Sequence, residues 1–221
     1  MIEKKVKLST VHKIMSKRMV KSWSTPQFQL ETEINCTKIT QLRNSLDYRP
    51  SYTVIITKAV ACILLNHPYL NAAWRDDHVV QFEEVNIGIA MDSPRGLVVP
   101  VIKDVNNKSL YNLQSELVDL KERAEKGGLN ISDFEGGTFT ISNLGMYRIN
   151  SFNPIINPPE AAILGIPRFM TQLVMNEGQL MEKKIMRPVL SVDHRVTDGA
   201  TAARFITDVA TLLEDPNRLI Q

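Results

Sequence analysis

The sequence is poor in the residues that cross-link small folds or hold metal ions. Its 221 residues include only two cysteines, Cys36 and Cys62, which lie far apart and form no C-x-x-C pair. The four histidines show neither the H-x-H nor the H-E-x-x-H spacing of common metal sites. We therefore expect no disulfide framework, no cysteine-based zinc site and no catalytic metal.

Long apolar runs and a strong charge of one sign are missing as well. The longest apolar stretch, 54–65, is interrupted by Thr57 and Lys58 and is shorter than the roughly 20 residues that span a bilayer. Four of the first seven residues are charged, so this start is unlike the apolar core of a secretory signal peptide. With 26 basic and 24 acidic residues, the net charge of +2 argues against a dedicated nucleic-acid binder. We expect a soluble, intracellular protein.

The composition that is present suits one folded domain. Hydrophobic residues make up 43% of the chain and charged residues 23%, which is typical of a globular protein. A chain of this length buries roughly 70% of its unfolded surface, which is enough for a substantial core. No internal repeat and no linker rich in Pro, Gly or Ser divides it. We expect a single domain over residues 1–221.

The apolar spacing predicts a mixture of helices and strands. Helices are expected over 11–23, 39–46, 54–66, 110–126 and 198–214. Strands are expected over 27–36, 79–82, 85–91, 97–102, 138–143, 161–166, 171–175 and 179–192. The two kinds of element do not alternate strictly. The expected class is therefore α+β, with helices packed against a mixed or antiparallel sheet.

One segment near the C-terminus, 191–200 (SVDHRVTDGA), carries a candidate catalytic histidine. His194 lies at the end of a predicted strand, and Asp198 lies at the start of the following helix. A neutral imidazole can take a proton from a thiol or hydroxyl near pH 7, and Asp198 can cap the helix. The alternative is that His194 only packs at the strand end and Asp198 is only a helix cap. The spacing alone leaves both open.

A second candidate lies in the segment 136–145 (GGTFTISNLG). Alternation places Thr138, Thr140 and Ser142 on one face of a strand, with Ser142 near its end. A hydroxyl there can donate a hydrogen bond to a developing oxyanion. The G-x-S-x-G motif of serine hydrolases is missing. The alternative is a polar strand face followed by a glycine turn.

Three segments together resemble a known enzyme family. They are 193–200, which contains H-x-x-x-D-G, 137–145 (GTFTISNLG) and 155–165 (IINPPEAAILG). Weaker matches are Lys17-Arg18-Met19 and 96–101. The chain resembles, over about 8–219, the catalytic domain of the dihydrolipoamide acyltransferase components of 2-oxoacid dehydrogenase complexes. H-x-x-x-D-G by itself also occurs in chloramphenicol acetyltransferase and related acyltransferases, so the combination carries the resemblance.

The resemblance implies a fold, an activity and partners. The implied fold is that of chloramphenicol acetyltransferase, an α/β sandwich that assembles as a homotrimer, and trimers of this family build cubic or dodecahedral cores of about 24 or 60 chains. The implied reaction moves an acyl group between coenzyme A and the dihydrolipoamide of a lipoyl domain, in a 2-oxoacid or acetoin dehydrogenase complex. Implied partners are the lipoyl domain and the decarboxylase and dihydrolipoamide dehydrogenase components, in the cytoplasm or the mitochondrial matrix.

The resemblance also implies a role for each candidate residue. His194 would be the general base, Ser142 of a neighbouring subunit would stabilise the oxyanion, and Asp198 would hold the loop after His194, with Arg18 as its cationic partner. The site would lie in a channel between subunits, with the coenzyme A contacts unassigned. No lipoyl or peripheral-subunit-binding domain is recognised in the sequence, so the lipoyl group would arrive on another domain or chain. Two alternatives stay open: an acyltransferase acting on a small-molecule hydroxyl, and a non-catalytic core protein.

Overall fold

A six-stranded sheet forms the centre of the computed structural model, which describes residues 3–176 and 178–220. The strands follow the order β1-β11-β8-β7-β5-β6. Strands β5, β7 and β8 are parallel to one another, and the remaining pairs are antiparallel. The sheet is mixed, in agreement with the predicted α+β class. Its strands are β1 (Gln27–Glu31), β5 (Ile87–Ala90), β6 (Val101–Ile102), β7 (Phe139–Asn143), β8 (Ala162–Ile166) and β11 (Val189–Asp193).

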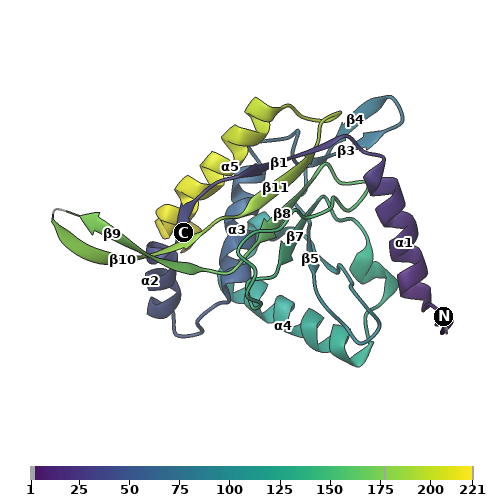
Figure 1. Cartoon of the computed structure of the whole chain (residues 1–221), viewed down its shortest axis with the longest axis horizontal. Coiled ribbons are helices and arrows are strands. Elements are labelled where there is room, and N and C mark those ends of the chain that lie inside the picture. Colours follow the sequence, from purple (N-terminus) through teal and green to yellow (C-terminus); the bar gives the residue numbers. More distant parts are fainter. Residues whose placement is uncertain (1–2, 177, 221) are drawn as a thin grey trace.

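Three helices cover one face of this sheet. They are α3 (Tyr52–Leu64), α4 (Leu110–Lys126) and α5 (Gly199–Glu214), and α3 contacts both of the others (Figure 1). Serine side chains cap the first two, since Ser51 accepts a hydrogen bond from the backbone of Val54, and Ser109 caps α4 in the same way. Gly127, in the left-handed conformation at φ 70°, ends α4.

The core between helices and sheet is mainly apolar. Phe139 of β7 and Phe205 of α5 are fully buried, and their ring centroids are 5.9 Å apart. Helix α3 is buried on most of its surface, as its nearly continuous apolar sequence predicts. Burial of such aromatic and aliphatic side chains is the dominant favourable contribution to folding, at roughly 1.5–3 kcal/mol for each large residue.

The segment 151–159 is tied to the strands that carry the candidate site. A Cβ atom added to Gly165 on β8 would lie 2.9 Å from the ring of Phe152, so this close approach requires glycine. The hydroxyl of Ser191 donates to the carbonyl of Pro154 at 2.6 Å. Ser22, near the end of α1 (Thr10–Trp23), donates to the carbonyl of Ile156 at the same distance. The segment therefore fixes β8, β11 and α1 together.

Two predicted strands are each divided between two sheets, which corrects the expected single strands over 27–36 and 179–192. A second sheet has the order β2-β10-β9, with β2 (Ile34–Asn35), β9 (Met170–Asn176) and β10 (Gln179–Met186). The breaks meet in space, because Thr32 donates to the carbonyl of Pro188 and Arg187 pairs with Glu33 at 3.0 Å. Pro188 has no backbone N–H to donate to a neighbouring strand, so it separates β10 from the strand that follows, β11 (Val189–Asp193). Figure 1 shows β9 and β10 extending away from the body of the molecule.

The remaining elements are short. Strands β3 (Ala72–Arg75) and β4 (His78–Gln81) form a hairpin, whose second strand corresponds to the one expected over 79–82. Helix α2 spans Thr37–Ser45, and the 3-10 helices are η1 (Val105–Asn107), η2 (Ile131–Phe134) and η3 (Pro216–Ile220). The strand expected over 97–102 is reduced to β6 and an isolated bridge at Val98, since Pro100 interrupts the ladder. Within the described residues, no helix is long and apolar enough to cross a membrane.

Candidate active site

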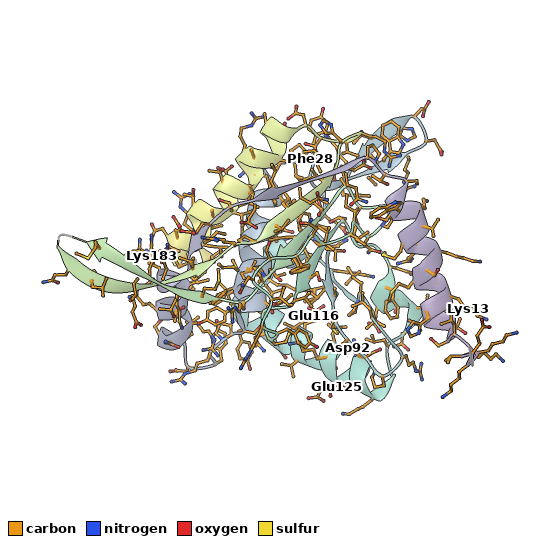
Figure 2. All side chains as sticks on the ribbon, viewed as in Figure 1. Lys13, Phe28, Asp92, Glu116, Glu125 and Lys183 are labelled. Carbon is orange, nitrogen blue, oxygen red and sulfur yellow. The ribbon has the colours of Figure 1, made fainter. Side chains whose placement is uncertain are left out.

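His194 lies immediately after β11, at one end of the large sheet. Its backbone N–H donates to the carbonyl of Pro26 at 2.9 Å. Its ring packs against the ring of Phe28 on β1, with centroids 4.7 Å apart. Figure 2 labels Phe28 at this end of the sheet. The residue is exposed, so the imidazole is held in place on one side and remains accessible to a reacting group.

An ion pair fixes the backbone on both sides of His194. The buried carboxylate of Asp193 accepts two hydrogen bonds from the guanidinium of Arg195, from Nε at 3.0 Å and from the terminal nitrogen at 2.7 Å. These bonds raise the pKa of Arg195. The guanidinium also lies over the ring of Trp74 at 5.2 Å. A two-pronged Arg–carboxylate contact is geometrically specific, so it restricts the turn that carries the histidine.

Asp198 caps α5, as the sequence predicts. Its carboxylate accepts a hydrogen bond from the backbone N–H of Thr201 at 2.7 Å, and this bond lowers the pKa of Asp198, with a smaller contribution from the charge of Arg204. Among the described residues, no ion pair joins Asp198 to Arg18, the partner that the resemblance suggested. Arg18 instead lies beside Glu160, whose carboxyl group feels its charge. Asp198 lies at the start of α5, whereas Arg18 on α1 lines the cavity that Glu160 also lines.

Ser142 lies near the end of β7, where its register is opposite Ala90 of β5 and Gly165 of β8. The next residue, Asn143, fixes the turn that follows. The side-chain nitrogen of Asn143 donates to the hydroxyl of Thr53 at 2.8 Å, and the side-chain oxygen accepts from the backbone N–H of Gly145 at 2.7 Å. The serine is half-buried, and the strand and turn hold its backbone on both sides.

The sheet register places His194 and Ser142 at opposite ends. Ser142 is opposite Gly165, and Gly165 is opposite Val189, the first residue of β11. His194 follows the other end of β11, five residues further on. Five residues along a strand and two steps between strands separate the two by about 20 Å. One chain therefore does not bring the two candidate residues together.

Comparison with known proteins identifies the family. The sequence profile described as 2-oxoacid dehydrogenases acyltransferase (catalytic domain) matches residues 2–221. The dihydrolipoyllysine-residue acetyltransferase component of the pyruvate dehydrogenase complex of Rickettsia bellii is 36% identical over 217 residues, which is 94% of this chain and 52% of that protein. The chain belongs to the 2-oxoacid dehydrogenase acyltransferase family. It spans about half the length of the curated relatives it matches.

Solved structures confirm the fold of this acyltransferase domain. The dihydrolipoamide acetyltransferase of Azotobacter vinelandii, investigated for the role of a serine, a histidine and an asparagine in its catalytic mechanism, superposes with a TM-score of 0.94 at 30% identity, covering 100% of this chain and 95% of that one. The cubic core of a pyruvate dehydrogenase multienzyme complex gives the same values. Chloramphenicol acetyltransferase, at 14% identity and a TM-score of 0.59, covers 89% of this chain and 94% of that one and confirms the fold that the resemblance implied.

The acyltransferase domain also contains a buried carboxyl group that sequence reasoning did not single out. Glu160 precedes β8, and its side chain accepts hydrogen bonds from the hydroxyl of Thr140 at 2.5 Å and from the amide of Asn157 at 3.0 Å. Burial raises the pKa of Glu160 to about 7, against the smaller opposing effects of these two bonds and of Arg18. The available signal was a glutamate placed directly before the apolar run 161–166.

Glu160 lies between two cavities. One, of about 580 Å3, is lined by Arg18, Glu84 and Gly137, among others. The second, of about 560 Å3, includes Arg195. Over residues 3–176 and 178–220, no three His, Cys, Asp or Glu side chains gather as metal ligands would. The groups that this end of the sheet offers for chemistry are therefore an imidazole, guanidinium groups and a carboxyl group.

The raised pKa of Glu160 predicts how stability depends on pH. Folding favours the protonated form, so stability is fully present below the unfolded pKa of 4.5 and is lost as the pH rises to the folded value of about 7. The difference corresponds to about 3 kcal/mol. Glu160→Gln is always neutral and should lack this loss. Urea unfolding at pH 5 and pH 8 should show wild type losing stability relative to the variant. An equal change in both proteins would contradict the prediction.

Proposed function

We propose that this domain transfers an acyl group between coenzyme A and the dihydrolipoamide of a lipoyl domain. The observation that carries the proposal is a match of spacing. In the Azotobacter vinelandii enzyme the histidine follows the serine by 52 positions and the asparagine follows the histidine by four. In this chain His194 follows Ser142 by 52 positions, and Asp198 follows His194 by four. The third position carries an aspartate here.

The geometry suits proton transfer from a thiol. A thiol with a pKa of about 8.5 is mostly protonated at pH 7, and the thiolate is the nucleophile. The His194 imidazole takes the proton as the sulfur attacks the thioester carbonyl, which becomes a tetrahedral oxyanion. The hydroxyl of Ser142 donates a hydrogen bond to that oxygen. The intermediate then expels the sulfur of the original thioester, and this thiolate takes the proton from the imidazolium, so the base is restored.

Two copies of the chain are needed to build this site. His194 and Ser142 are about 20 Å apart in one chain, whereas a base and an oxyanion donor must both lie near the reacting carbonyl. A homotrimer that repeats one head-to-tail interface supplies His194 from one subunit and Ser142 from the next. The exposed position of His194 supports this arrangement. Thioester and thiol would meet in the channel between the two subunits.

The assembly proposed is a trimer within a larger core. The structural likeness to a cubic core, over the whole of this chain, supports such an assembly. A lipoyl domain would bring the acyl group, and decarboxylase and dihydrolipoamide dehydrogenase components would act before and after the transfer. Acetyl transfer is the proposed form, since the relatives are named for it. The cytoplasm, or the mitochondrial matrix in a eukaryote, is the proposed location.

Assays with free substrates separate this proposal from its two alternatives. A panel of acyl-coenzyme A thioesters with free dihydrolipoamide should give transfer, fastest with acetyl-coenzyme A. An acyltransferase for small-molecule hydroxyls would be inactive with dihydrolipoamide, and a non-catalytic core protein would be inactive with every acceptor. Either result would overturn the proposal.

Replacement of the proposed base gives the second test. His194→Ala should lower the rate of acyl transfer by at least about 10², the lower limit for loss of a general base. The variant should fold, because the residue is exposed and its one backbone hydrogen bond does not involve the side chain. Turnover and circular dichroism measure the two expectations. A rate within about threefold of wild type would show that His194 is not the base.

Asp198 offers a matched pair of variants. Its proposed role is to hold the loop after His194 by capping α5, and asparagine caps a helix about as well as aspartate. Asp198→Asn should therefore keep most of the rate, whereas Asp198→Ala should lower both the rate and the thermal stability. Turnover and melting temperature measure the two. Equal losses in both variants would assign a role to the charge itself and contradict the capping role.

A further inference from the structure

One backbone hydrogen bond links the residue after Glu160 to the residue before His194. The backbone of Glu160 bridges Ala73 of β3, and the next residue, Ala161, accepts a hydrogen bond from the backbone of Asp193 at 2.8 Å. Asp193 is the residue immediately before His194. A displacement of the backbone at Glu160 can therefore reach the end of β11, which precedes the histidine, through Ala161 and this one hydrogen bond.

The side chain of Glu160 fastens three segments at this point. Its hydrogen bond to Thr140 reaches β7, and its bond to Asn157 reaches the segment 151–159. The residue is only 5% exposed. The contact with Thr140 is kept in either protonation state, because a hydroxyl both donates and accepts. The carboxyl group thus links the start of β8 to β7 and to the segment 151–159.

We propose that uncharged Glu160 is a positioning residue for His194, and that acyl transfer slows when Glu160 ionises. This inference rests on the acyl-transfer activity proposed above. A buried carboxylate needs compensating donors or a cation, and only two donors reach Glu160 within the described residues. Ionisation favours movement of the side chain toward the cavity and Arg18, which weakens its bonds to Thr140 and Asn157 at the start of β8. Burial sets this ionisation near neutral pH.

The charged groups around Glu160 do not remove the cost of its ionisation. Arg18 and Lys21 face it from α1, and Arg75 and Asp76 from the β3–β4 hairpin. Glu83 and Glu84 lie across the first cavity, and Asp193 and Arg195 form a closed pair beside the second. The charge that acts on Glu160 is that of Arg18. It favours the ionised form, but burial outweighs it.

The test compares the pH profiles of wild type, Glu160→Gln and a control. Glu83→Gln removes a carboxylate on the exposed wall of the same cavity, so it should retain the wild-type profile. Acyl transfer from acetyl-coenzyme A to free dihydrolipoamide is measured from pH 6 to 9, with the rate without enzyme subtracted. Glu160→Gln should match wild type at pH 6 within about twofold and exceed it at pH 9 by at least about fivefold, since a displaced general base loses part of its 10²–10⁴ effect. The difference should lie in kcat, with KM for coenzyme A unchanged.

The outcomes are distinguishable. An active wild type whose profile coincides with that of Glu160→Gln overturns the positioning role and leaves the proposed function standing. A wild type that is inactive at every pH overturns the proposed function and this inference with it. Glu160→Ala, which removes both hydrogen bonds, should lower kcat at every pH. If that variant does not fold, the comparison with Glu160→Gln decides alone.

Discussion

The register between β7, β8 and β11 is the constraint on which the site depends. Side chains alternate along a strand, so a slip of one residue would move every side chain to the other face. Phe139 on β7 packs against Phe205, and Ser191 on β11 is hydrogen-bonded to the segment at Pro154, so both strands are anchored. The same register then fixes His194 at one end of the sheet and Ser142 at the other.

The end of the sheet that carries His194 has a high density of polar contacts. An Asp193–Arg195 pair holds the backbone beside the histidine, and the side chain of Glu160, just before the neighbouring strand β8, accepts a hydrogen bond from Thr140 on β7. A buried carboxyl group is costly to ionise, so burial of Glu160 lowers the stability of the fold at high pH. The same burial keeps the side chain in one position, hydrogen-bonded to Thr140 and Asn157. Polar contacts thus gather at this end of the sheet, while the face covered by α3, α4 and α5 packs against an apolar core.

Local signals predicted the helices and the caps of two of them, and long-range contacts decided the rest. Ser109 and Asp198 act as caps within their own helices, so their roles were readable from neighbouring residues. The division of 27–36 and 179–192 between two sheets could not be predicted from neighbouring residues, because the alternation of side chains is the same whichever partner a strand pairs with. The burial of Glu160 and the placement of Arg18 beside it also depend on segments distant in sequence. The separation of His194 from Ser142 follows from register, which the sequence does not specify.

Co-assembly of two inactive variants tests the shared site most directly. His194→Ala and Ser142→Ala chains are denatured, mixed in equal amounts and refolded together, and mixed trimers are verified by mass. At a site shared between two subunits, the first subunit carries an intact His194 with a probability of about one half. Independently, the second subunit carries an intact Ser142 with a probability of about one half. About a quarter of the sites should then regain full activity, because a closed ring repeats one heterologous interface. Activity that stays at the level of the separate variants, in verified mixed trimers, would contradict the shared site.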